Sequence, residues 1–261
     1  MKLMYKGNNQ VNIKKILTNV FLGSLALSGF SEAAVSLDRT RVIFDGENKS
    51  ISLNINNNNK QLPYLAQGWI ENEESKKITS PLIVLPPVQR LEPGKSSQMK
   101  IESLPDIKNL PQDRESLFYF NMREIPPKSD KPNTLQIALQ TKIKLFYRPE
   151  AIAPQQNSAP WQEKMQLERK GSVVFVKNPT PYYITIINAG AHENTDAKEF
   201  TPIMIAPFSE INIGMTNEQL GNTPVITYIN DYGGRPKLAF DCKNTICSVT
   251  KKDHYINSKG I

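Results

Sequence analysis

The sequence is poor in the residues from which most active sites and metal centres are built. Among 261 residues there are two histidines, His192 and His254, and neither lies in a metal-binding motif. The chain has no Gly-x-Ser-x-Gly sequence and no glycine-rich phosphate-binding loop. Paired carboxylates such as Glu73 and Glu74 lie in a charged segment typical of a solvated loop. We therefore expect no enzyme and no cofactor.

Long apolar runs are missing beyond the beginning of the chain. Four lysines precede an apolar segment at 16–27, and small residues ending at Ala33 suit a signal peptidase. This segment is short for a membrane span. We expect a signal peptide over residues 1–33, cleaved after Ala33, and a soluble mature protein that is exported.

The excess of positive charge lies largely in that leader. Beyond residue 33 the chain keeps 28 basic and 24 acidic residues, a net charge of +4, because residues 1–33 hold four lysines and Glu32. The basic residues are scattered, so we expect no nucleic-acid partner. A mild basic bias still favours an acidic partner or a terminal carboxylate.

Cysteine is scarce too, with Cys242 and Cys247 as the only pair. In an oxidising compartment two nearby cysteines are typical of a disulfide that closes a hairpin. The alternative, a zinc site, needs two more ligands, and His254 is the only further candidate nearby. We favour the disulfide.

What the sequence does contain is alternation of apolar and polar residues, as at 51–55 and 118–122. A period of two predicts half-buried strands. Turn signals such as Asp45-Gly46 and Pro93-Gly94 separate these stretches. Short strands at this spacing predict an all-β protein built from antiparallel sandwiches.

A proline-containing segment at 150–160 has little to bury and divides two such strand-rich regions. We therefore predict a first domain over 34–149, a linker over 150–160 and a second domain over 161–261.

The most informative stretch is 135–149. Its first half alternates, and its second half carries Lys144 among large apolar residues before a proline that cannot continue a ladder. We expect one long strand that can pair with a second chain and bind that chain's carboxylate.

Arg41 and Lys144 are cations with apolar neighbours in the sequence. Such a charge is costly to bury unless it is paired. Either each side chain extends along its own stem to water, or both reach one cleft and hold an anion. The pattern leaves both interpretations open.

Seven segments, in order, carry a resemblance to a known family: 35–41, 61–67, 86–93, 110–120, 135–149, 178–183 and 228–236. In these segments the chain resembles the periplasmic pilus (fimbrial) chaperones of the PapD family. The resemblance implies two immunoglobulin-like β-sandwich domains set in an L, or boomerang, with a subunit-binding cleft between them.

The resemblance also implies residue roles. Arg41 and Lys144 match the cations that anchor a pilus subunit's C-terminal carboxylate, and Leu135, Ile137 and Leu139 match the apolar row that the chaperone lends to the subunit. Pattern alone slightly favours a place for these three in the chain's own core, and the resemblance reverses that preference. Strict alternation puts Lys144 on the opposite face from the row, so we expect an intervening bulge or strong twist.

Glu115, Arg148 and Asp231 match a family charge cluster that holds the two domains in their relative orientation. Without the resemblance, three separate surface charges of little energetic consequence would be the simpler interpretation.

The function implied is that of an ATP-independent chaperone. It would complete the fold of pilus subunits (pilins and adhesin) by donor-strand complementation, prevent edge-to-edge aggregation and deliver the subunits to an outer-membrane usher. Whether the unliganded protein self-associates is left open. The competing hypotheses are a structural pilus subunit or adhesin, which should carry a donor extension and one incomplete domain, and an exported hydrolase.

Overall fold

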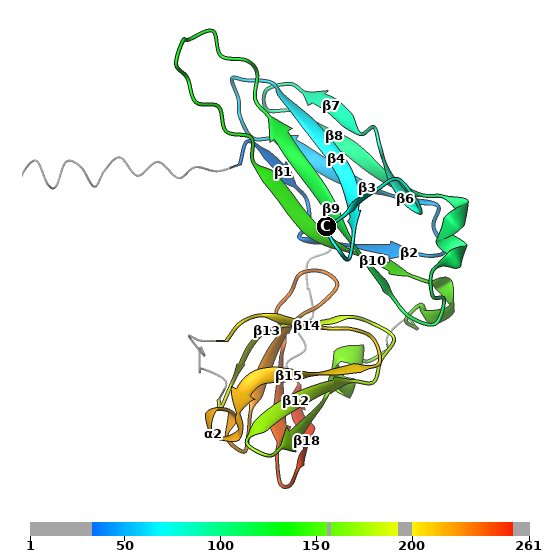
Figure 1. The fold of residues 1–261 in the computed structure, drawn as a ribbon, viewed down its shortest axis with the longest axis vertical. Helices are drawn as coiled ribbons and strands as arrows, with labels where there is room; N and C mark the ends of the chain where they lie inside the picture. Colours follow the sequence, from blue (N-terminus) through cyan, green and yellow to red (C-terminus); the bar gives the residue numbers. More distant parts are fainter. Residues whose placement is uncertain (1–32, 156–157, 193–199, 253–261) are drawn as a thin grey trace, which may run out of the picture. The chain divides into compact units, whose positions relative to one another are not determined.

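The computed structural model describes residues 33–155, 158–192 and 200–252. Apart from its last residue, the predicted signal peptide lies outside this part of the chain. Strands dominate the described residues (Figure 1). None of the helices found there has the length and apolar character needed to cross a membrane.

The first domain packs two sheets around one core. The four-stranded sheet has the spatial order β1 (Val35–Leu37), β3 (Ser50–Asn57), β8 (Ser96–Ser103) and β6 (Leu82–Leu85). The six-stranded sheet has the order β2 (Arg41–Asp45), β10 (Gln140–Arg148), β9 (Ser116–Ile125), β4 (Tyr64–Asn72) and β5 (Lys77–Ile78), with β7 (Val88–Leu91) also paired to β4.

Alternation explains which side chains fill this core. In β3, Leu53 and Ile55 are fully buried while Ser52 and Asn54 are exposed. Burying such an aliphatic side chain contributes about 1.5–3 kcal/mol, and Leu53→Ala would leave a cavity costing about 2–5 kcal/mol. The same residues that alternate in the sequence therefore hold the sheets together, which confirms the all-β prediction for this domain.

Strand β10 has one edge that is only partly covered. It pairs antiparallel with β9 from Gln140 to Tyr147, but it pairs parallel with β2 only from Lys144 to Arg148. Within the described residues, no strand pairs with the β2-side edge of residues 140–143. Unpaired N–H and C=O groups on such an edge are a template for another strand.

The strand is shorter than the 135–149 that the sequence predicted. Leu139 still accepts a backbone hydrogen bond from Glu124 (3.0 Å), but residues 135–139 form no ladder with any described strand. If the β10–β9 register continued, residues 137 and 136 would face Pro126 and Pro127. Proline lacks the N–H that a ladder needs, so β9 offers no partner for this segment.

The second domain consists of one eight-stranded sheet. Its spatial order is β14 (Ile203–Ile205), β13 (Ile184–Gly190), β16 (Val225–Ile229), β17 (Lys237–Asp241), β18 (Ile246–Lys252), β11 (Gln166–Lys170), β12 (Val173–Asn178) and β15 (Ser209–Thr216). Side chains from both halves of this path meet in one buried cluster, so the sheet wraps around its own core.

Helices are short throughout the described residues. They are the 3₁₀ segments η2 (Pro105–Asn109), η3 (Glu150–Ile152) and η4 (Trp161–Lys164), and the single α-helical turn α2 (Asn217–Leu220). The turn of α2 begins with a capping box between Thr216 and Gln219 and is followed by Gly221, which has a positive φ of 61°.

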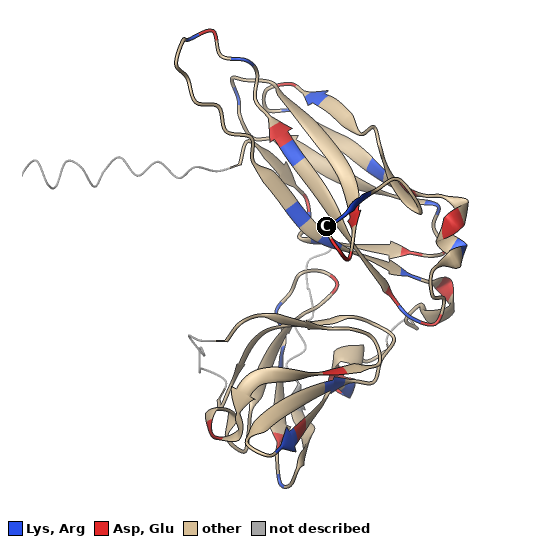
Figure 2. Ribbon diagram, in the orientation of Figure 1, with Lys and Arg blue, Asp and Glu red and all other residues tan. Residues whose placement is uncertain are grey.

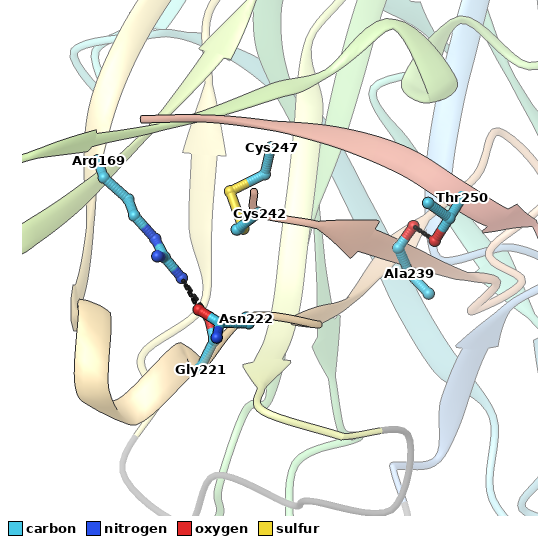
Figure 3. Close-up of a disulfide and its surroundings, with 7 residues drawn as sticks. All are labelled: Arg169, Gly221, Asn222, Ala239, Cys242, Cys247 and Thr250. Carbon is cyan, nitrogen blue, oxygen red and sulfur yellow. Dashed lines mark hydrogen bonds between the residues drawn. A yellow bond between two sulfur atoms is a disulfide. The ribbon is translucent and has the colours of Figure 1, made fainter. Parts of the chain in front are cut away.

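A disulfide joins Cys242, just after β17, to Cys247 in β18 (Figure 3). Both cysteines are buried in the second core, and this confirms the predicted pairing over the zinc alternative. The third zinc candidate, His254, lies outside the described residues. By the loop-entropy argument a bridge between residues this close in sequence contributes about 2 kcal/mol. Nearby, the Arg169 guanidinium donates to the Gly221 carbonyl (Figure 3).

Candidate functional site

Two cations differ from the other basic residues in their surroundings. The described lysines and arginines are spread over both domains and interspersed with acidic residues (Figure 2). Arg41, the first residue of β2, and Lys144 in β10 are direct neighbours in the parallel ladder and are both partly buried. Two positive charges are thus held side by side where water is limited.

Neither cation has an ionic partner among the described residues. The Arg41 guanidinium donates one long hydrogen bond, of 3.5 Å, to the Ile229 carbonyl, and its Nε is buried without a partner. Lys144 Nζ donates to Thr185 Oγ1, also at 3.5 Å. The sequence had indicated neither Ile229 nor Thr185, because both come from the second domain and no local signal links them to the cations.

The electrostatics of the pair favour an anion. Burial lowers the pKa of Arg41, and the charges of Asp231 and Glu115 only partly oppose this effect. Burial, together with the charge of Arg41, lowers the pKa of Lys144. Because burial and mutual repulsion both disfavour the charged forms, a carboxylate bound here would offset both costs through charge-assisted hydrogen bonds.

The position of Lys144 also corrects one sequence-based expectation. The β10–β9 ladder runs from Gln140 to Tyr147 without a register shift, so of the two expected alternatives, a bulge or a strong twist, no bulge occurs in this stretch. Ile143 and Leu145 face the first core, whereas Lys144 contacts the second domain.

The predicted apolar row is exposed. The residues retain 84% (Leu135), 64% (Ile137) and 39% (Leu139) of their accessible surface. The competing interpretation, that these three side chains belong to their own domain's core, is therefore wrong for this structure. Exposed apolar side chains at three alternate positions are typical of a surface that contacts another molecule.

The second charged cluster surrounds Arg148, whose side chain is only 5% exposed. Its Nε and Nη2 donate to Glu115 Oε1 at 2.9 and 2.7 Å, and its Nη1 donates to Asp231 Oδ2 at 2.8 Å. The other Glu115 oxygen accepts the Tyr183 backbone N–H at 2.7 Å. The structure thus brings together the three residues that the resemblance grouped, two from the first domain and one from the second.

Two aromatic rings complete this cluster. The Arg148 guanidinium lies 4.7 Å from the ring centroid of Trp161 and 5.0 Å from that of Tyr182, and these rings lie 4.3 Å apart. A cation over an aromatic face gains about 0.5–2 kcal/mol. Sequence analysis missed both rings, since only the folded chain brings them to Arg148.

Charge pairing shapes the titration of the Arg148 cluster. Burial disfavours the arginine's charge, but the hydrogen bonds and charges of Asp231 and Glu115 outweigh it and raise the pKa of Arg148. Burial raises the pKa of Glu115 to about 7, against the opposing charge and hydrogen bonds of Arg148 and the Tyr183 N–H. Arg148 is therefore held in its charged form by its neighbours, unlike Arg41 and Lys144.

No metal-binding cluster of three or more His, Cys, Asp or Glu residues occurs in the described part of the chain. The site offers two cations, an open strand edge and an exposed apolar row. These are features of a surface that binds a polypeptide.

Comparison with known proteins agrees with this description. Residues 34–153 match the family "Pili and flagellar-assembly chaperone, PapD N-terminal domain", and residues 160–240 match "Pili assembly chaperone PapD, C-terminal domain". The chain is 54% identical to the Escherichia coli chaperone protein PapD, over 92% of this chain and 99% of PapD. It is 42% identical to the chaperone protein PmfD of Proteus mirabilis, over 93% of this chain and 98% of PmfD.

The solved structure of the periplasmic chaperone SfaE is also similar. It superposes with a TM-score of 0.63 at 30% identity, covering 78% of this chain and 98% of SfaE. The matches span both domains, which sets aside the hypotheses of a pilus subunit and of a hydrolase. The chain belongs to the PapD family of periplasmic pilus-assembly chaperones, which are not enzymes.

Proposed function

We propose that this chaperone captures pilus subunits by adding one of their strands to the open edge of β10 and anchoring the subunit's C-terminal carboxylate at Arg41 and Lys144. The observation that carries the proposal is the meeting of these features at one place. The open edge of residues 140–143 ends where β2 begins, and Arg41 and Lys144 are the first residues of that ladder.

The direction of β2 favours a terminal carboxylate as the ligand. A strand added in line with β2 would run parallel to β10 and would have to stop at Arg41, because β2 occupies the edge from there on. A chain that stops at this point places its C-terminal carboxylate beside both cations. Arginine can hold it by a bidentate fork and lysine by a point charge.

The apolar row supplies the second contact. Leu135, Ile137 and Leu139 are exposed at alternate positions, so in an extended strand they would all point to one side. A subunit that lacks one strand of its own sandwich has an open core, and these side chains would fill it. Main-chain pairing would give affinity for many subunits while side-chain packing selects among them.

Export and delivery complete the proposal. The lysine-rich, apolar beginning of the chain supports export to the periplasm by a cleaved signal peptide over residues 1–33. We further propose delivery of the bound subunit to an outer-membrane usher, where the next subunit replaces the lent strand. In the unliganded protein the open edge and apolar row favour self-association, which would hide both.

Co-expression with a candidate pilus subunit tests the proposal. The two proteins should co-purify as a one-to-one complex, and the complex should be lost with Lys144→Ala. Failure to form a complex with any subunit encoded nearby would contradict subunit capture. A complex that survives both Lys144→Ala and Arg41→Ala would contradict the anchor.

A further inference from the structure

A third cation lies on the open part of β10. Lys142 precedes Lys144 by two residues and so points to the same face of the sheet. A strand bound parallel to β10 cannot slip past Arg41, because β2 blocks that direction. Nothing in the described sheet blocks a slip the other way.

A slip of two residues is the register error that the apolar alternation alone cannot prevent. It keeps every side chain of the bound strand on its original face, so the alternation of apolar residues does not exclude it. It moves the chain end by about 7 Å, the rise of two strand residues. The carboxylate would then lie beside Lys142 instead of Lys144, and the wrong subunit pockets would receive the apolar row.

The structure shows that Lys142 is already occupied. Its Nζ donates to Glu71 Oε2 of β4 at 2.7 Å and to Ser75 Oγ at 2.9 Å, and it lies 4.3 Å from the centroid of the Tyr119 ring. Among the described residues, the Lys144 amine on the same strand makes only its long hydrogen bond to Thr185. Lys142 is therefore paired with a carboxylate of its own chain, whereas Lys144 is not paired with a carboxylate of the described residues.

Glu71 is in turn fixed in place. Its Oε1 accepts the indole N–H of Trp69 at 2.9 Å, and Trp69 lies beneath the guanidinium of Arg123, 5.3 Å from the ring centroid. Burial opposes the charge of Glu71, but the hydrogen bonds from Lys142 and Trp69 prevail and lower its pKa. Glu71 thus stays ionised and aimed at Lys142.

We propose that Glu71 sets the register of the bound strand: because Glu71 already pairs with Lys142, Arg41 and Lys144 are, among the described residues, the cations at this edge that still lack a carboxylate. Glu71 is a positioning residue, since it acts through Lys142 and does not touch the bound chain. The inference rests on the proposed function and adds to it a determinant of specificity.

Cross-linking of synthetic peptides tests the register. Both native cysteines are joined in the disulfide, so Thr141→Cys introduces the only free thiol. Each peptide has alternating apolar residues, a free C-terminal carboxylate and one cysteine. In one the cysteine stands two positions before the last residue and faces position 141 when the last residue faces 143 and its carboxylate lies at Lys144. In the other the cysteine is the last residue and faces position 141 after a slip of two.

In the Thr141→Cys protein the first peptide should form the disulfide in about tenfold excess over the second. Adding Glu71→Gln, which keeps an acceptor for Trp69 but removes the charge, should reduce that excess to about threefold or less. Adding Lys142→Met as well should restore it, because the competing cation is gone. Ser75→Ala, which removes the second hydrogen-bond acceptor of Lys142, should shift the ratio in the same direction and replaces Glu71→Gln if that variant does not fold.

An excess unchanged by Glu71→Gln, or one that Lys142→Met fails to restore, would overturn the inference while leaving strand capture intact. If the C-terminal amides cross-linked as well as the corresponding acids, or if neither acid cross-linked, the proposed function itself would be contradicted, and this inference with it.

Discussion

Arg148 and Lys144 lie four residues apart on the same strand, yet their surroundings have opposite effects on their charges. Arg148 is buried with two carboxylates and two aromatic rings, and its pKa is raised. Lys144 is partly buried beside another cation, without an ion pair among the described residues, and its pKa is lowered. The first arrangement stabilises the folded chain, and the second leaves a cost that a ligand can offset.

The two sites should differ in the free energy that is lost when one charged side chain is removed, and this difference distinguishes a structural cluster from a binding site. Removing one member of a paired, buried cluster leaves its partner's charge uncompensated. Removing one of two neighbouring cations that have no ionic partner among the described residues relieves repulsion and costs little. The same type of substitution should therefore reduce stability at one site and reduce binding at the other.

The largest effect is expected from Arg148→Ala. It leaves Glu115 and its hydrogen-bonded surroundings without a cation, and we expect a loss of about 3–5 kcal/mol in the free energy of unfolding, measured by urea denaturation. Arg148→Lys should lose less, because it keeps the charge but not the fork. A loss below about 1 kcal/mol would mean that these are ordinary surface charges.

Lys144→Ala should do the reverse. We expect subunit affinity to fall about a hundredfold, or about 3 kcal/mol, with an unfolding free energy that is unchanged or slightly higher. Arg41→Ala should behave similarly. Lys142→Met is the matched control on the same strand and should retain affinity, as measured by titration with a purified subunit. Normal pilus assembly supported by folded Lys144→Ala protein would rule out the anchor.

Ile137→Ser tests whether the apolar row acts only in the complex. Since Ile137 is exposed in the free protein, the unfolding free energy should change by less than about 0.5 kcal/mol. Subunit affinity should fall about tenfold, because a buried isoleucine contributes about 1.5–3 kcal/mol. A variant that loses its fold together with its binding would instead assign Ile137 to the chain's own core.

A smaller effect is expected in the pH dependence of capture. The pKa of Lys144 is lowered in the free protein, and a bound carboxylate favours the charged amine and should raise it again. Affinity should therefore decline as the pH rises through the lowered pKa, before an ordinary lysine titrates. Lys144→Arg should keep its affinity to higher pH. Identical alkaline profiles for the two proteins would show that Lys144 is not the titrating group.

Much of the fold was predictable because the alternation of apolar and polar residues indicates which side chains of a strand are buried. The alternation at 118–122 placed Phe118, Phe120 and Met122 in the core, where the structure has them. The disulfide was predictable because two cysteines close in sequence have few alternatives in an exported protein. These features depend on local pattern and composition, and both can be seen in the sequence without knowledge of the fold.

The extent of β10 was not predictable in the same way. The alternation at Leu135, Ile137 and Leu139 shows which side chains would share a face, but not whether the partner strand belongs to the same chain. Pro126 and Pro127 carried the missing information, since they deny this segment a ladder with β9. Reading it required the register between the two strands, which is a property of the fold.

The surroundings of the charged residues were the least predictable part. Trp161 and Tyr182 reach Arg148, Thr185 reaches Lys144, and Glu71 reaches Lys142, all across long separations in sequence. The family resemblance supplied Arg41, Lys144 and the members of the Arg148 cluster as candidates. Tertiary contacts alone decide which cations have an ionic partner and which do not.

The most direct test of the account compares one synthetic peptide with a free C-terminal carboxylate and the same peptide as its amide, each titrated against the purified protein and against Lys144→Ala. The protein should prefer the acid by about tenfold, and Lys144→Ala should bind both forms equally weakly. Equal affinity for acid and amide in the unaltered protein would contradict the claim that the unpaired cations at the end of the open edge hold a terminal carboxylate.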